Sequence, residues 1–292
     1  MFAGTYTAIV TPFRDGKVDE PALEHLIKTQ IKGGVDGVVP VGTTGESPTL
    51  SFEEHIDLIE KTVQFAAGRI KVLAGTGGNS TDEAIYLTIS AGKAGADGSL
   101  QVAPYYNKPT QEGLFQHFRA IAYATKLPVV LYSIPGRCGV EIGIETVQRL
   151  ARECKNIVGI KEAGGNADRV SQLRAAVGSK FAILSGDDSL TLPFMAVGAQ
   201  GVISVASNII PREVAHMVRA FAVGKPAVAL RLHQQFYPLF RDLFIEANPG
   251  PVKAALAMMG QIEEEYRLPL VPMNPRNRET LKTTLKACGV LK

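Results

Sequence analysis

The sequence predicts an α/β protein, a closed (β/α)8 TIM barrel with a carboxy-terminal helical extension. Apolar, strand-like runs alternate with amphipathic helical stretches eight times between residues 1 and 224. Most of the run at residues 156–165 is apolar, as expected for a parallel strand buried on both faces. After residue 224 the strand patterns stop and only helical patterns remain. A chain of 292 residues is within the usual length of one α/β barrel.

The first strand is expected at residues 5–13, and a helix follows at residues 19–32. Apolar residues in that helix recur at helical spacing, and the pair Gly33-Gly34 ends it. The second strand is expected at residues 35–42. Ser51 then opens the next helix, and Glu54 lies three residues later, which is the spacing of a capping box.

The remaining six units follow the same pattern. Strands are expected at residues 71–77, 97–104, 128–134, 157–163, 181–186 and 201–206, and helices at residues 81–94, 111–125, 144–153, 168–177, 189–197 and 212–223. Helices at residues 226–244, 251–259 and 277–287 would form the extension. We therefore expect a barrel domain over residues 1–224 and a helical domain over residues 225–292.

The composition favours a cytoplasmic protein with a large core. Hydrophobic residues make up 46% of the chain, and the net charge of +3 comes from scattered basic residues without a nucleic-acid-binding run. The three cysteines are far apart in the sequence, which fits a reducing compartment. A signal-type amino terminus and an apolar run of membrane-spanning length are both lacking. We expect neither nucleic acid nor membrane as a partner.

Lys161 lies near the carboxyl end of the apolar run at residues 156–165, NIVGIKEAGG. Burial disfavours the ammonium, so the pKa of a buried lysine falls and a neutral amine becomes available to form a Schiff base with a carbonyl. The alternative is that the strand ends at Ile160 and Lys161 points into water, because lysine is seldom fully buried.

The carboxyl ends of barrel strands, where the active sites of this fold lie, carry mainly hydroxyl groups and phenols here. The polar and site-forming residues expected at this rim are Thr43, Thr44, Tyr105, Tyr106, Asn107, Tyr132, Arg137, Lys161, Gly186, Asp187, Ile203 and Ser204. The same rim has neither histidine nor a cluster of carboxylates. The expected placement of these hydroxyl, phenol and guanidinium groups around Lys161 favours a catalytic role for that lysine.

This set suits carbonyl chemistry on a small acid. Lys161 would capture the carbonyl, and tyrosine and threonine hydroxyls would pass protons, since each both donates and accepts. Backbone amides near Thr43 and Thr44 could hold one carboxylate, and Arg137 could hold a second one bidentately. Taken singly, each residue also has an ordinary structural explanation, such as a core tyrosine or a surface arginine.

Other motifs carry less weight. The glycine-rich loop at residues 75–80 follows a strand, but it lacks the third glycine of a dinucleotide fingerprint. The five histidines are scattered, without a pair at metal-ligand spacing, so we expect no metal. Asp187-Asp188 is interpreted as a helix amino-terminal cap. Cys138 lies beside Arg137 without an evident partner base.

Three segments, GTTGE at 42–46, YSIPGR at 132–137 and GIKE at 159–162, resemble the pyruvate-dependent class I aldolases of the N-acetylneuraminate lyase and dihydrodipicolinate synthase family. The resemblance runs nearly the whole length. AIVTPF at 8–13, PYYN at 104–107 and NPGPVK at 248–253 bring it closest to the dihydrodipicolinate synthase branch. It implies condensation of pyruvate with aspartate semialdehyde and cyclisation, in diaminopimelate and lysine biosynthesis.

The resemblance also implies individual roles. Lys161 would form the Schiff base with pyruvate, and Tyr132 would exchange protons there through Thr43 and Tyr106, the latter from a neighbouring subunit. Pyruvate would be held by Thr44 and the backbone near Ile203, at a rim that includes Gly186, and Arg137 would receive the carboxylate of aspartate semialdehyde. No cofactor would be needed beyond the covalent adduct, and the assembly would be a homotetramer built as a dimer of dimers.

The family resemblance further implies lysine as an effector, bound in a cleft between subunits. The matching positions are Ser47, Pro48, Phe52, His55, Gly77, Asn79, Glu83 and Tyr105. Pro48 and Phe52 depart from the best-known lysine-sensitive pattern, which has alanine and histidine there. Two alternatives to the synthase stay open: an aldolase for sialic acid or a ketodeoxy sugar acid, and a non-catalytic metabolite sensor on the same scaffold.

Overall fold

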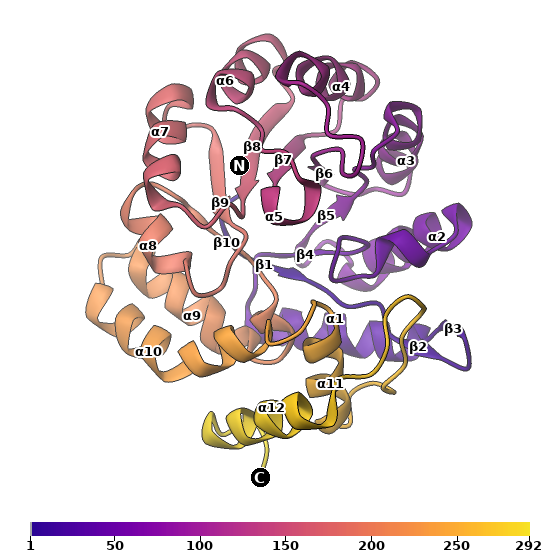
Figure 1. The fold of residues 1–292 in the computed structure, drawn as a ribbon, viewed down its shortest axis with the longest axis vertical. Coiled ribbons are helices and arrows are strands. Elements are labelled where there is room, and N and C mark those ends of the chain that lie inside the picture. Colours follow the sequence, from indigo (N-terminus) through magenta and orange to yellow (C-terminus); the bar gives the residue numbers. More distant parts are fainter. Residues whose placement is uncertain (1) are drawn as a thin grey trace.

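A computed structural model describes residues 2–292 and contains the closed barrel that the sequence predicts. Eight parallel strands follow one another in the order β1-β10-β9-β8-β7-β6-β5-β4, and β1 pairs with both β10 and β4 (Figure 1). The barrel strands are β1 (Gly4–Ala8), β4 (Gly37–Val39), β5 (Lys71–Gly75), β6 (Gly98–Val102), β7 (Val129–Ser133), β8 (Ile157–Glu162), β9 (Ala182–Ser185) and β10 (Gly201–Ser204).

Helices surround the barrel as the alternating pattern requires (Figure 1). They are α1 (Glu20–Gly33), α2 (Phe52–Ala66), α3 (Thr81–Lys93), α4 (Gln111–Tyr123), α6 (Ile144–Glu153), α7 (Ala167–Val177), α8 (Thr191–Ala196) and α9 (Pro211–Ala222). The predicted capping box at the start of α2 is confirmed, because Ser51 accepts from the Glu54 amide and Glu54 accepts from the Ser51 amide.

The first two strands are shorter than expected, for reasons of backbone chemistry. The first ends at Ala8, and β2 (Phe13–Arg14) and β3 (Lys17–Val18) form a separate hairpin through the positive-φ turn Asp15-Gly16. The second ends at Val39, because Pro40 has no amide hydrogen to donate and Val41 has a φ of 50°. The short helix α5 (Pro135–Cys138), which the sequence pattern did not predict, follows β7.

Two apolar clusters divide the core. One lies inside the barrel and includes Tyr6, Leu100 and Tyr132, and the other fills the space between the barrel and the helices. Successive side chains of a strand point to opposite faces, so each strand contributes to both. In β8, Ile160 belongs to the outer cluster, which directs Lys161 inward and Glu162 outward.

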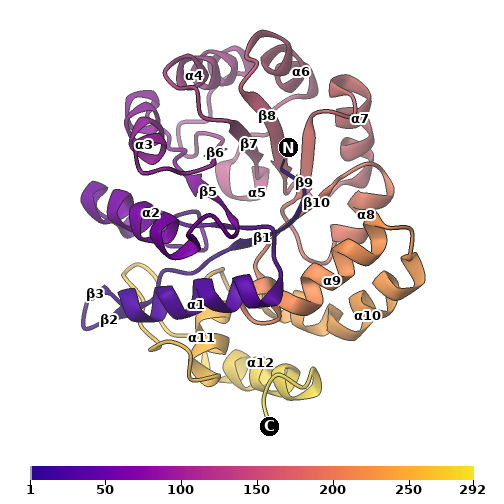
Figure 2. The same cartoon turned by 180° about the vertical axis from the view of Figure 1, so that it is seen from behind.

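The carboxy-terminal extension consists of α10 (Pro226–Asp242), α11 (Gly250–Met258) and α12 (Pro275–Ala287). Helix α10 packs beside α9, and α12 packs against α10 and α11 (Figure 1, Figure 2). Residues of all three extension helices join the outer apolar cluster. We retain the division into residues 1–224 and 225–292 as a proposal about topology, with one core shared between the two parts.

Even α10, with 17 residues, is too short to cross a membrane. The same holds for every helix within residues 2–292, none of which is both long and apolar enough.

Candidate active site

A cavity of about 250 Å³ lies at the carboxyl ends of the barrel strands. Loops after β4 and β9, strands β7 and β8 and helix α5 bring six of the predicted catalytic and substrate-binding residues to its wall. They are Thr43, Thr44, Tyr132, Arg137, Lys161 and Gly186. Segments far apart in the sequence therefore converge on one site, because parallel barrel strands all end at the same rim.

Lys161 points into this cavity and is only 6% exposed. Burial and, to a smaller extent, nearby Arg137 lower the pKa of its ammonium to about 8, against the opposing effect of Asp187 and Asp188. Among residues 2–292, no carboxylate lies within ion-pair distance of its Nζ atom. At pH 7 the amine is therefore still mostly protonated, but about a tenth of it is neutral, far more than for an exposed lysine, and this neutral form is the Schiff-base nucleophile.

Tyr132 lies directly beside Lys161 in the register of β7 and β8. The Lys161 Nζ atom is 4.1 Å from the centre of the phenol ring. Burial raises the pKa of Tyr132, and the charge of Arg137 and a hydrogen bond with Thr43 offset part of this rise. The phenol is therefore protonated at neutral pH and can donate to an oxygen bound at Lys161, with Thr43 as its proton partner.

Gly186 leaves room for the lysine side chain. A Cβ atom at this position would lie 2.6 Å from the Ala163 Cβ and 3.1 Å from the Lys161 Cε. Any larger residue would therefore displace the reactive side chain or the end of β8. Asp187, the next residue, also lines the cavity, and burial raises its pKa while Lys161 lowers it.

Asn248 belongs to the NPGPVK segment at 248–253, and its part in the site was not predicted from the sequence. Its side-chain amide donates to the Thr44 Oγ1 over 2.9 Å, and its carbonyl accepts from Arg137 Nη2 over 3.2 Å. Within residues 2–292 its buried Oδ1 has no hydrogen-bond partner. The extension therefore holds two predicted substrate-binding residues, a contact that only the tertiary structure brings about.

Two predicted residues lie away from the cavity wall. Tyr106, in the loop after β6, is 90% exposed and has a φ of 72°. Ile203 is buried in the apolar cluster inside the barrel, and Val205 lines the cavity instead. The Tyr106 phenol thus does not reach the cavity of its own chain.

The predicted lysine site lies only partly at the cavity wall. Ser47 and Tyr105 line it, and Asn79 donates to the Tyr105 carbonyl over 3.3 Å. His55 is buried, with Nε2 2.8 Å from the Gly75 carbonyl oxygen. Burial raises the pKa of the Tyr105 phenol, and the nearby carboxylate of Glu83 raises it further.

The prediction that the acidic pair caps the following helix was wrong. The Asp188 carboxylate accepts from the Val205 and Ala206 amides and from the Ser204 hydroxyl, and α8 has no side-chain cap. It thus stabilises the turn after β10, because strands β9 and β10 are neighbours in the barrel. Cys138 lines the cavity, and burial raises the pKa of its thiol to about 11, so it stays protonated.

Known proteins resemble this chain over its whole length. The family model described as the dihydrodipicolinate synthetase family matches residues 1–288. The 4-hydroxy-tetrahydrodipicolinate synthase of Aquifex aeolicus is 52% identical over 98% of this chain and 97% of that protein. The structure of the synthase from Methylacidiphilum fumariolicum SolV has a TM-score of 0.98 at 60% identity, covering 99% of this chain and 96% of that chain.

A second structure is named as a complex with pyruvate. It is the chloride-inhibited dihydrodipicolinate synthase from Acinetobacter baumannii complexed with pyruvate, with a TM-score of 0.97 and 47% identity over 100% of both chains. Fold and sequence agree across these relatives. This chain belongs to the dihydrodipicolinate synthetase family.

Proposed function

We propose that this chain is an enzyme, a lyase of the Schiff-base class, that condenses pyruvate with L-aspartate 4-semialdehyde to 4-hydroxy-tetrahydrodipicolinate, in the pathway to diaminopimelate and lysine. The observation that carries the proposal is Lys161, buried in the cavity with a pKa lowered to about 8 and Tyr132 beside it. The family and the relatives named above support the same activity.

The first half of the reaction uses Lys161 and Tyr132. The neutral amine attacks the keto carbon of pyruvate, and Tyr132 protonates the departing oxygen, so that one water leaves and an iminium forms. Thr43 returns a proton to Tyr132. Loss of a methyl proton then gives the enamine, and Thr44 with its neighbouring amides would hold the pyruvate carboxylate.

The second half needs the acceptor. The enamine carbon attacks the aldehyde carbon, and the oxygen that develops there takes up a proton to become the hydroxyl group. The amino group of the acceptor then attacks the iminium carbon, which closes the ring and releases the Lys161 amine. Arg137 stands at the cavity wall, where its guanidinium would hold the acceptor carboxylate. The covalent bond to Lys161 supplies the activation, so the proposed chemistry uses no further cofactor.

Trapping the adduct tests this assignment. The protein is incubated with pyruvate and reduced with borohydride, and the modified peptide is mapped, with an adduct on Lys161 as the expected result. Turnover is then compared with aspartate semialdehyde and with N-acetylmannosamine as acceptor. Absence of the adduct would remove the Schiff-base mechanism, and preference for N-acetylmannosamine would favour a sugar-acid aldolase.

The assembly is part of the proposal. Tyr106 is exposed in its own chain, so we assign its phenol to the proton relay of a neighbouring copy within a homotetramer, a dimer of dimers. Sedimentation would measure the assembly. Mixed oligomers of Tyr106→Phe and Lys161→Arg chains should regain part of the activity that each lacks, and no regain would contradict the shared site.

Lysine is the proposed effector, and the cytoplasm the proposed location. The proposed effector site comprises Ser47, His55, Asn79, Glu83 and Tyr105, and the carboxylate of Glu83 offers a partner for an ammonium group. Titration of lysine at saturating pyruvate should lower the rate, and a flat response to millimolar lysine would refute the effector site. The cytoplasmic assignment rests on the three free cysteines.

A further inference from the structure

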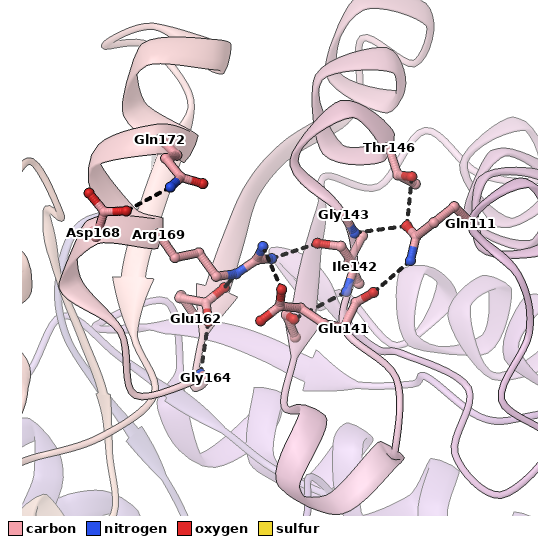
Figure 3. Close-up of polar contacts among 11 residues, drawn as sticks. Gln111, Glu141, Ile142, Gly143, Thr146, Glu162, Gly164, Asp168, Arg169 and Gln172 are labelled. Atoms are coloured by element: carbon pink, nitrogen blue, oxygen red, sulfur yellow. Dashed lines mark hydrogen bonds and ion pairs between the residues drawn. The ribbon is translucent and has the colours of Figure 1, made fainter.

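Behind the wall of the cavity, a buried arginine joins the strand of Lys161 to the segment that carries Arg137. Glu162 follows Lys161 in β8, points outward and is completely buried. Arg169 of α7, which is 5% exposed, donates through Nε to the Glu162 Oε2 over 3.0 Å. Figure 3 shows Arg169 reaching from α7 between Glu162 and Glu141.

The other two arms of the guanidinium hold the chain between α5 and α6. Nη1 donates to the Glu141 Oε2 over 3.1 Å, and Nη2 donates to the Ile142 carbonyl over 2.5 Å. Glu141 lies four residues after Arg137, so the segment that Arg169 holds is the one that sets the place of Arg137. A planar guanidinium can reach three acceptors in fixed directions, which a lysine cannot do.

Gln111 of α4 binds the same segment from the side opposite Arg169 (Figure 3). Its Oε1 accepts from the Gly143 amide and the Thr146 hydroxyl, each over 2.8 Å, and its Nε2 donates to the Glu141 carbonyl over 2.8 Å. Three consecutive residues of the segment, 141–143, are therefore held by side chains from α4 and α7. Such bracing fixes a loop far more firmly than its own backbone would.

The carboxylates of Glu162 and Glu141 leave no room for a side chain at Gly164. Its amide donates to the Glu162 Oε1 over 2.8 Å, and a Cβ atom there would lie 2.7 Å from that oxygen and 3.3 Å from the Glu141 Oε1. Arg169 pairs with both carboxylates, and Glu162, which is completely buried, has no room to move aside. The cluster of Glu162, Arg169 and Glu141 is thus a built contact rather than a surface ion pair.

We propose that Arg169, paired with Glu162, is a positioning residue that sets the distance between Lys161 and Arg137 and thereby the affinity for the acceptor aldehyde. The inference rests on the proposed function, in which Arg137 receives the acceptor carboxylate. Schiff-base formation with pyruvate uses Lys161, Tyr132 and Thr44, none of which contacts Arg169. The effect should therefore appear in the second substrate and spare the first.

Arg169→Lys is the main test, measured by steady-state kinetics with both substrates varied. The variant keeps the charge but loses the three-way contact, and a displaced Arg137 should raise the KM for aspartate semialdehyde by about 10-fold. The KM for pyruvate and the yield of borohydride-trapped Lys161 should stay within about twofold of wild type. An unchanged KM for aspartate semialdehyde would overturn the proposal.

Arg174→Lys is the matched control on the same helix. Arg174 also fastens backbone carbonyls, those of Phe181 and Gly198, but it has no contact with the Arg137 segment. It should lower stability without changing either KM. An equal rise in the KM for aspartate semialdehyde in both variants would reduce Arg169 to a general structural role and overturn the proposal.

Glu141→Gln decides the question if Arg169→Lys does not fold. Glu141 is 45% exposed at its side chain, and its loss leaves the buried Glu162 pair with Arg169 intact. We expect about a threefold rise in the KM for aspartate semialdehyde, smaller than for Arg169→Lys, because one of three contacts weakens. No rise would count against the proposal. Failure of wild type to turn over aspartate semialdehyde would instead refute the proposed function itself.

Discussion

Two buried lysines in this chain have opposite surroundings. Lys161 of β8 is 6% exposed and lies, among residues 2–292, without a carboxylate at ion-pair distance. Lys253 of α11 is completely buried, and its Nζ is 2.5 Å from the Glu46 Oε1. The Lys253 ammonium also lies 4.3 Å from the centre of the Phe13 ring. Within the described residues, one ammonium has no ion-pair partner, and the other is paired with a buried carboxylate.

A buried lysine can therefore serve catalysis, as proposed for Lys161, or stabilise the fold, as Lys253 does. Glu46 lies in the loop that carries Thr43 and Thr44, so its pair with Lys253 joins the helical extension to the site. A buried charge is tolerable there because its partner is buried with it. Burial lowers the pKa of both ammonium groups, and at Lys253 the adjacent Glu46 carboxylate opposes that shift directly. At Lys161 no carboxylate among residues 2–292 is close enough for an ion pair, and the pKa falls to about 8.

Loss of the reactive amine should have the largest effect. Lys161→Arg keeps the charge but offers no neutral amine, so activity should fall by at least about 1000-fold and no borohydride adduct should form. Lys253→Arg is the matched control, because arginine can still pair with Glu46, and it should lose no more than about threefold. Similar losses in both variants would erase the distinction between the two lysines.

Loss of the structural cation should destabilise the fold. Lys253→Met leaves the Glu46 carboxylate buried without its ammonium, which should lower the free energy of unfolding by about 3–5 kcal/mol in urea titrations. The double variant Lys253→Met with Glu46→Leu removes both charges and should regain most of that loss. A loss below about 1 kcal/mol in the single variant would show that the pair is not structural.

Removal of the Lys161 ammonium should raise the free energy of unfolding, whereas removal of the Lys253 ammonium should lower it. The pKa of Lys161 is lowered from 10.5 to about 8, a difference worth about 3 kcal/mol at pH 7, where folded and unfolded chains both carry the proton. Lys161→Met should therefore raise the free energy of unfolding by about that amount, with a gain that shrinks as pH rises from about 8 towards 10.5. A destabilised Lys161→Met variant would contradict the assignment of an unpaired buried ammonium.

The pH dependence should be the smallest of these effects. Because only the neutral amine attacks, kcat/KM for pyruvate should rise about 10-fold per pH unit below pH 8 and level off above it. Rates measured between pH 6 and 9 at saturating acceptor would show the slope. The Lys253→Arg variant should keep the same profile, and a flat wild-type profile would refute the role of the lowered pKa.

The strand pattern alone was enough to predict that Lys161 and Tyr132 lie on neighbouring strands. The order of apolar runs placed Lys161 in the sixth barrel strand and Tyr132 in the fifth, and consecutive strands of this fold are neighbours. Local signals such as the Ser51 capping box were confirmed for the same reason, because they depend on residues a few positions apart. Strand ends were less predictable, as Val41 shows, because its backbone conformation depends on tertiary packing.

The sequence by itself thus determined the barrel, the rim and the lysine on it, since period and order are properties of the chain. Only the tertiary structure decided which distant residues support that rim. Asn248 meets Thr44, Lys253 meets Glu46, and Arg169 holds Glu162 and Glu141. These contacts join residues whose spacing in sequence carries no periodic signal. They form because burial leaves each polar group without water and requires a partner wherever the fold brings one within reach.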